Sequence, residues 1–290
     1  MTKRILVLTA AVLLLAVSAR ADEWEKKFDV TSAPQLTFRT GDGHIRVDTW
    51  DQKQISARIV TEGWRIAEGT GYPPSQNEVR VEATRSGDAV TIDLREPRNN
   101  WRFHIGRHWR IEIEIHLPRT ADATLRTSDG HVSVSGLTGK LDVETSDGHI
   151  TLTDVHGDLR LRSSDGHIEG TSLDGKLDAG TSDGRIRVSG RFDGLELRTS
   201  DGSVEASVLA GSHPSAAWSL RTSDGNVELR IPGNLDADLD AETDDGNISS
   251  DFPITVSGKI GRSSLHGKLN AGGPTIRLRT SDGHIRVSRL

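Results

Sequence analysis

The tetrad Thr-Ser-Asp-Gly, or a close variant, recurs along this chain, and four consecutive intervals between copies are each 18 residues long. The aspartates of this regular stretch are Asp129, Asp147, Asp165, Asp183 and Asp201. The same Asp-Gly pair occurs with wider spacing at Asp42, Asp224, Asp245 and Asp282. A fixed period of this length is the signature of a repeat architecture, in which each repeat packs against its neighbours.

Apolar residues fill the same columns in successive repeats and alternate with polar residues, which predicts short strands with one buried face. The columns are Val132, Ile150, Ile168, Ile186 and Val204; Leu141, Leu159, Leu177 and Leu195; and Val143, Leu161, Ala179 and Leu197. Each repeat therefore has at least two strands, one on either side of the Asp-Gly turn. The pattern leaves room for a third strand through Leu137, Val155 and Leu173.

Equal spacing with identical columns favours a solenoid over a ladder of hairpins. We expect an all-β, single-stranded β-helix or β-solenoid of about 18 residues per coil. Successive coils should lie ~4.8 Å apart, the spacing of hydrogen-bonded strands. A single coil cannot bury enough apolar surface to offset its backbone entropy, so stability must come from stacking.

The turn motif has a structural explanation. Thr lies two residues before Asp in eight of the nine motifs, with Ser163 as the exception, and its strand parity places it on the inner side. We expect its methyl group to pack inside and its hydroxyl to bond the backbone. Asp suits an Asx-type turn and Gly a positive φ, so all nine aspartates are predicted to be structural turn residues.

After Gly202 the period loosens. The interval to Asp224 is consistent with a five-residue bulge at 211–215, after which the columns resume at Trp218. The 37 residues from Gly246 to Asp282 are enough for two coils, one of them without the motif. The last strand, at 285–290, would then be an open edge at which self-association could occur.

Residues 22–125 are less regular and are interpreted as elaborated N-terminal coils forming a cap, whereas 126–290 are the repeat coils. One coil segment surrounds Asp42. Strand-like runs follow at Gln54–Thr61, Glu78–Thr84, Ala89–Leu94 and Trp109–Leu117.

Residues 1–21 have the pattern of a secretory signal peptide, with Lys3 and Arg4 before an apolar run that ends near Val17 and a small-x-small site at 19–21. The mature chain is expected to begin at Asp22, in the periplasm, at the outer envelope or outside the cell; an uncleaved anchor is the alternative. We expect no later membrane span.

The chain has no cysteine, which excludes disulfides and lipid-modified Cys. Without the signal the formal charge is −9, which argues against nucleic acid as a partner.

The segment 126–134, Arg-Thr-Ser-Asp-Gly-His-Val-Ser-Val, and its echoes at 144–152 and 279–287 resemble a bacterial family of uncharacterised β-strand-repeat proteins labelled "putative adhesin", related to adhesin-head β-helix domains. The resemblance covers essentially the whole mature chain. It implies a secreted or envelope-associated right-handed β-helix and supplies no catalytic residues. The long insert at 48–125 and the loosened coils after 202 depart from the pattern.

A stretch outside the repeat combines aromatic and basic residues, which suit stacking on sugars and pairing with anionic groups. The alternative is that its tryptophans plug the end of the solenoid. The predicted ligand-binding residues are Trp101, Arg102, Arg107, His108, Trp109 and Arg110.

A column of histidines follows the motif glycine at His131, His149 and His167, with His44 and His284 in equivalent places. Stacked imidazoles beside a row of Asp could bind a divalent metal. However, adjacent side chains of one ladder point in parallel and do not converge as zinc ligands do. The favoured interpretation is that the histidines are structural and simply project from the surface of the coils. The match to the calcium-binding motif of β-rolls is weak. No cofactor is expected.

A charged column lies three residues before each Asp and holds Arg at six of nine positions. Ion pairs between adjacent coils are its simplest role, and a surface for anionic glycans is the alternative.

No Asp or Glu outside the repeat lies in a cluster with a residue that could act as a catalytic base. A polysaccharide-cleaving β-helix enzyme is therefore a lesser hypothesis. The sequence thus predicts a non-catalytic, exported scaffold, adhesin-like or envelope-associated, whose partner is an envelope glycan or protein surface.

Overall fold

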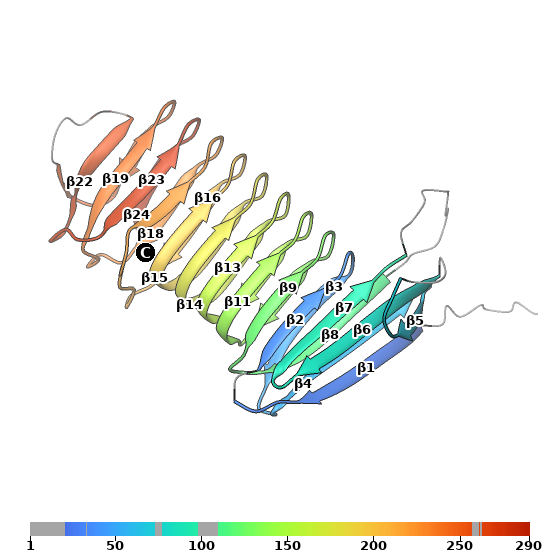
Figure 1. Ribbon diagram of the computed structural model, residues 1–290. Coiled ribbons are helices and arrows are strands. Elements are labelled where there is room, and N and C mark those ends of the chain that lie inside the picture. Colours follow the sequence, from blue (N-terminus) through green and yellow to red (C-terminus); the bar gives the residue numbers. More distant parts are fainter. Residues whose placement is uncertain (1–20, 33, 73–76, 98–109, 257–260, 262) are drawn as a thin grey trace, which may run out of the picture.

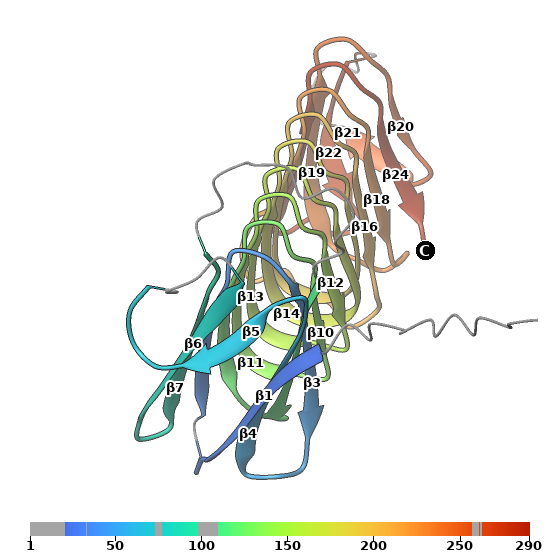
Figure 2. The same cartoon turned by 90° about the vertical axis from the view of Figure 1, so that its right-hand side faces the viewer.

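The computed structural model describes residues 21–290 except 33, 73–76, 98–109, 257–260 and 262, and its described part is built of 24 β-strands without a helix. The strands form one continuous hydrogen-bonded sheet that winds into an elongated stack of coils (Figure 1). Figure 2, seen from the end with the N-terminal strands, shows the coils lying one behind another. No helix in the described part is long and apolar enough to span a membrane.

Each coil turns at its Thr-Ser-Asp-Gly segment, here called the corner, and the strands on either side form two rows of parallel strands. The post-corner row has the order β8 (Arg110–Pro118), β3 (His44–Trp50), β10 (Val132–Ser135), β12 (Ile150–Thr153), β14 (Ile168–Gly180), β15 (Ile186–Arg198), β16 (Val204–Val208), β18 (Val227–Ile231), β24 (Ile285–Arg289) and β20 (Ile248–Ser250).

The pre-corner row runs alongside it. Its order is β7 (Ala89–Arg95), β2 (Gln35–Arg39), β9 (Asp122–Arg126), β11 (Thr138–Glu144), β13 (His156–Arg162), the second halves of β14 and β15, β17 (Trp218–Arg221), β23 (Thr275–Thr280) and β19 (Ala237–Thr243). β14 and β15 pass from one row to the other without a break.

The core lies between the two rows. All residues of the three predicted apolar columns are buried, and so are Leu137, Val155 and Leu173. Cross-strand partners such as Val132 and Ile150, or Leu141 and Leu159, occupy the same column in successive coils. The alternation in the sequence therefore identified the inner face correctly, because a strand places every second side chain on one side.

Antiparallel strands cover the ends of the stack. At one end β4 (Gln54–Glu62) pairs with β8, and β1 (Ala21–Asp29) pairs with β4. At the same end β6 (Glu78–Ser86) pairs with β7, and β5 (Arg65–Glu68) adds to the other side of β6 as a parallel strand. At the other end β22 (Ser264–Leu269) pairs with β19, and β21 (Ile254–Val256) with β22. Such covers protect open strand edges from pairing with other chains.

The coils do not stack in chain order at either end. The coil of β7 and β8 lies outside the earlier coil of β2 and β3. At the other end the C-terminal coil of β23 and β24 lies between the coil of β17 and β18 and the coil of β19 and β20.

Two predictions for the C-terminal region are therefore wrong. Residues 246–282 do not form two coils: after β20 they form the antiparallel pair β21–β22 and then return into the stack through β23. The strand at 285–290 is not an open edge, because β24 has β18 on one side and β20 on the other. The bulge expected near residue 211 is confirmed as an insertion between β16 and β17.

Candidate functional site

A ladder of threonine hydroxyls holds the corners together. Thr145 Oγ1 donates toward the carbonyl oxygens of Ser128 at 3.0 Å and Gly130 at 3.4 Å in the preceding coil, and accepts from the N–H of Gly148 at 3.2 Å. Equivalent bonds to the neighbouring corner of the stack occur at Ser163, Thr181, Thr199, Thr222, Thr243 and Thr280. The expectation for the threonine hydroxyl is confirmed, and each hydroxyl ties one coil to the next.

Removing one of these hydroxyls should destabilise the protein measurably. Thr145→Val keeps the buried shape but leaves the N–H of Gly148 without its acceptor, so we expect a loss of about 1–3 kcal/mol in the free energy of unfolding. Urea unfolding measures it. The control is Thr151→Val, on the exposed side of β12, which should change little; equal effects would contradict a special role for the corner hydroxyl.

The motif glycines are required for close approach rather than for a positive φ. Among them only Gly43 has φ in the left-handed region, at 112°, so the predicted reason is wrong for the other eight. A Cβ on Gly148 would lie 1.9 Å from the carbonyl oxygen of Gly130, and one on Gly166 would lie 1.9 Å from that of Gly148. Coils can stack at this corner only if no side chain stands between them.

A second glycine row was missed by the sequence reasoning. Gly139, Gly157 and Gly175 have φ of 149°, 126° and 116°, and a Cβ on Gly157 would lie 2.1 Å from the carbonyl oxygen of Gly139. They mark another bend of the coil. Their 18-residue spacing was a usable signal in the sequence.

The motif aspartates lie at the corners, with exposed side chains. Their backbone N–H groups donate to the preceding coil, as Asp147 does to the carbonyl oxygen of Ser128 at 3.0 Å. Among the motif aspartates of the described chain, only the carboxylate of Asp42 accepts a backbone N–H of its own turn, and it does so from the adjacent Gly43 rather than from the residue two positions on, so the expected Asx turns are not found. Because the preceding coil already satisfies the turn amides, the other carboxylates remain a row facing water.

The corner ladder ends at Glu96. The coil outside the Asp42 corner lacks the tetrad, and the carboxylate of Glu96 accepts instead from the N–H groups of Gly41 at 3.1 Å and Asp42 at 3.2 Å and from the hydroxyl of Thr40 at 2.7 Å. The Glu96 carboxylate thus takes the donors that most of the later corners direct at carbonyl oxygens of the neighbouring coil.

The histidines form a stack along the post-corner row. Neighbouring ring centroids of His44, His131, His149 and His167 are 4.8–4.9 Å apart. Each Nδ1 in the regular part accepts the backbone N–H of the next coil, at 3.0 Å from His149 to His131 and 2.9 Å from His167 to His149. The Nδ1 atoms of His131, His149 and His167 are therefore each engaged with the backbone of the next coil.

This arrangement makes stability sensitive to mild acid. Burial lowers the pKa of His131 below its ordinary value, and the neighbouring His149 and His44 add to the shift. The unfolded chain binds this proton more readily than the folded one, so its contribution to stability is present above pH ~6.5 and is lost as pH falls through the lowered pKa. We expect the unfolding midpoint in urea to fall between pH 7 and pH 5.

The matched control replaces the three central histidines by Asn. Asn226 already serves as the acceptor for the N–H of His284, at 2.8 Å, so Asn can keep the ladder bond without titrating. The His131→Asn, His149→Asn, His167→Asn variant should lose the pH dependence in this range. Persistence of the full dependence would assign it to other groups.

The predicted metal residues His131, His149 and His167 thus lie in parallel, with Nδ1 committed to the backbone. Among the described residues, metal-type ligand atoms converge instead at Asp240, Glu242 and His266, within 4.8 Å of one another. Arg279 and Arg277 already pair with Asp240 there, at 2.7 Å and 3.3 Å. Two guanidinium groups oppose a divalent cation, so this cluster acts as an ion-pair network.

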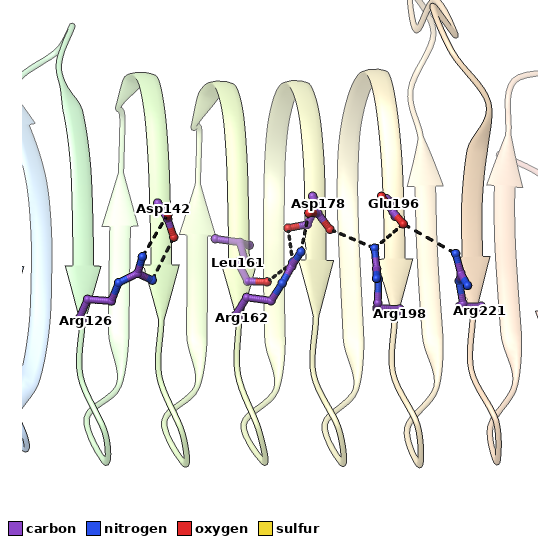
Figure 3. Close-up of polar contacts among 8 residues, drawn as sticks. All are labelled: Arg126, Asp142, Leu161, Arg162, Asp178, Glu196, Arg198 and Arg221. Carbon is purple, nitrogen blue, oxygen red and sulfur yellow. Dashed lines mark hydrogen bonds and ion pairs between the residues drawn. The ribbon is translucent and has the colours of Figure 1, made fainter.

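The charged column is an array of ion pairs (Figure 3). Arg126 binds both oxygens of Asp142, at 3.1 Å and 3.2 Å, and also pairs with Glu144 at 2.5 Å. Arg162 pairs with Asp178 at 2.5 Å. Carboxylate partners also occur for Arg39, Arg198, Arg221 and Arg279.

All six arginines of the predicted column therefore have an acidic partner. The array favours the structural interpretation over an anionic-glycan surface, although exposed pairs of this kind add little stability individually.

A groove of about 390 Å³ lies on the post-corner row over β14, β15, β16 and β18. Arg187 pairs with Glu205 at 2.9 Å and Arg230 with Glu228 at 2.8 Å. The other polar residues that line this groove are Glu169, Thr171, Ser189 and Ser207.

Most of the predicted ligand-binding stretch lies outside the described residues. This holds for Trp101, Arg102, Arg107, His108 and Trp109, and the predicted signal peptide, apart from Ala21, also lies outside. Arg110 is described: it is the exposed first residue of β8 and pairs with Glu112 at 3.4 Å. The stretch connects β7 to β8, where the outermost coil has no Thr-Ser-Asp-Gly corner.

A stack of parallel coils joined by a corner ladder defines a β-solenoid repeat protein. The sequence profile of the Toastrack DUF4097 family matches residues 67–288, and the chain belongs to this family. No curated protein matches the sequence.

Several solved structures are similar to this chain. One, described as a "putative adhesin" from Parabacteroides merdae, has 10% identity and a TM-score of 0.44, covering 93% of this chain and 96% of that one. A "putative adhesin" from Parabacteroides distasonis has 12% identity and a TM-score of 0.41, covering 92% and 97%. A "putative lipid binding protein" from the same species has 10% identity and a TM-score of 0.40, covering 92% and 96%.

Proposed function

We propose that this protein is an exported, non-catalytic β-solenoid that holds a binding surface, as an adhesin-like or envelope-associated component. The observation that carries the proposal is that the polar groups of the repeat serve the scaffold itself. Threonine hydroxyls and histidine Nδ1 atoms bond the next coil, and the arginines of the charged column pair with carboxylates. The repeat therefore offers rigidity and length rather than a convergent catalytic set.

The proposal includes a right-handed solenoid, as the resemblance implies, with about 18 residues per coil, which the 18-residue offset of the histidine contacts supports. It also includes cleavage of residues 1–21 and a final location in the periplasm, at the outer envelope or outside the cell. Cell fractionation with N-terminal sequencing of the mature protein tests these parts. Recovery in the cytoplasm with an intact N-terminus would contradict them.

We place recognition in the segment joining β7 and β8, because its aromatic and basic residues are the ones the repeat does not use. The test is binding of the mature protein to envelope fragments. Trp101→Ala, Arg107→Ala, Trp109→Ala should reduce binding while leaving the unfolding midpoint unchanged. The control variant is Arg185→Ala, Arg286→Ala, Leu209→Ala, which removes exposed groups of similar kind elsewhere and should bind normally.

Two other functions would be detected by separate assays on the same mature protein. Metal binding through His131, His149 and His167 would appear as heat on titration with Zn²⁺ or Ca²⁺. Glycan cleavage would appear as new reducing ends after incubation with envelope polysaccharide. We expect neither. Either positive result would replace the scaffold proposal.

A further inference from the structure

The two coils at the C-terminal end of the stack carry opposite charges. The coil at 235–251 has seven acidic residues and no basic one: Asp236, Asp238, Asp240, Glu242, Asp244, Asp245 and Asp251. The C-terminal coil at 275–290 has four arginines, at positions 277, 279, 286 and 289, and one acid, Asp282. These coils lie directly against each other.

Charge pairing accompanies this contact. Arg279 reaches Asp240 at 2.7 Å and Glu242 at 3.2 Å, and Arg277 reaches Asp240 at 3.3 Å. Opposite charges on neighbouring strands stabilise one pairing over another and disfavour like-charged neighbours. The basic coil is therefore the better neighbour for the acidic coil.

The slot occupied by the C-terminal coil has a bonding edge on both sides. On one side Ser281 donates its N–H to the carbonyl oxygen of Ser223 at 3.0 Å, and on the other Asp245 donates to that of Ser281 at 2.8 Å. The side chains of Ile276, Leu278, Ile285 and Val287 are fully buried in the slot. Its edges are β17 and β18 on one side and β19 and β20 on the other.

These contacts repeat a general pattern. The hydroxyl of Thr280 bonds the carbonyl oxygens of Ser223 and Gly225 as the hydroxyl of Thr222 bonds those of Ser200 and Gly202. The slot thus offers a Thr-Ser-Asp-Gly coil the same backbone acceptors as the other corners, together with acidic partners for its arginines. A turn at 270–274, with positive φ at Asn270 and Gly272, leads into the inserted coil.

We propose that residues 275–290 are an exchangeable insert, and that the slot between β17–β18 and β19–β20 also accepts this coil from a second copy of the chain. The exchanged form keeps every contact of the unexchanged one and differs only in the path of the connecting segment. Domain swapping of an identical element is a low-cost route to dimers under these conditions. High protein concentration should favour it during refolding.

The test uses the absence of natural cysteine. Glu228 of β18 and Arg286 of β24 are directly paired on the outer side of the sheet. The full-length single variants Glu228→Cys and Arg286→Cys are unfolded together in urea, refolded at high concentration and oxidised. We expect a disulfide between the two chains, seen as a dimer on a non-reducing gel.

Two controls define the geometry. The double variant E228C/R286C should cross-link within one chain. A mixture of Glu228→Cys and Ser249→Cys should not cross-link. Within one chain the inserted coil separates these positions by two strand spacings, ~9.6 Å, beyond the reach of a disulfide, and in an exchanged dimer the two cysteines belong to different slots. If the mixture of Glu228→Cys and Arg286→Cys chains refolds but yields no disulfide between chains, the proposed exchange is overturned.

A peptide experiment decides the matter if the cysteine variants fail to refold. A labelled peptide of residues 275–290 is added while the unmodified protein refolds, and size-exclusion chromatography measures its retention. We expect retention of this peptide and none of a version with the four arginines changed to Glu. Failure to retain the native peptide, or equal retention of both, would overturn the proposed slot.

Discussion

Gly148→Ala should destabilise the protein by about 3–5 kcal/mol, at the upper end of what single substitutions do. The added methyl group would lie 1.9 Å from the carbonyl oxygen and 2.6 Å from the carbonyl carbon of Gly130, both of them backbone atoms. Neither can move unless the two coils separate. Separation would break the bonds from Ser146 and Asp147 to the carbonyl oxygen of Ser128.

The consequence extends beyond one contact, because each coil of a solenoid is held only by its neighbours. Urea unfolding followed by circular dichroism measures the loss. Gly233→Ala is the matched control, since its Cβ meets nothing within 4 Å, and it should leave stability almost unchanged. A loss below about 1 kcal/mol for Gly148→Ala would contradict the close stacking at the corner.

Trp218→Ala should cost about 3–5 kcal/mol, the range for truncating a large buried aromatic residue. Trp218 is fully buried, and it fills the column that leucines fill in the preceding coils. It follows the insertion between β16 and β17 and restores the packing of the coil beyond it. Removing the indole leaves a cavity that the flanking strands, fixed by their ladder bonds, cannot close.

Trp218→Phe separates packing from polarity. The indole N–H of Trp218 has no hydrogen-bond partner in the described structure, so Phe removes a buried unpaired donor while keeping an aromatic ring. We therefore expect Trp218→Phe to be much less destabilising than Trp218→Ala. Equal losses for the two variants in urea unfolding would show that the ring does not fill the core in this way.

The sequence was sufficient to predict the scaffold because its signals are local and repeated. Alternation of apolar residues identified the inner columns, and the position of Thr145 and its equivalents identified the hydroxyl ladder. The role of the motif glycine was misassigned because a steric requirement between coils leaves no mark within one coil. The spacing of Gly139, Gly157 and Gly175 was an available signal of a second bend.

The order of the terminal coils could not be read from the repeat. Coils that share one motif and the same columns are interchangeable neighbours as far as backbone bonds are concerned, so chain order does not determine stacking order. The opposite charges of residues 235–251 and 275–290 were the one signal that could have indicated the insertion. Glu96, which caps the ladder, lies outside the motif and could be recognised only from its contacts.

The central claim is that Thr-Ser-Asp-Gly builds the corner of a scaffold and that its exposed aspartates are not a ligand site. The most direct test is urea unfolding of a variant with Asp129, Asp147, Asp165 and Asp183 changed to Asn, compared with the parent protein, each with and without Ca²⁺ or Zn²⁺. We predict that the variant is at least as stable as the parent, because like charges on adjacent coils are removed, and that neither protein responds to metal. A loss of about 2 kcal/mol or more, or stabilisation of the parent alone by metal, would contradict the claim.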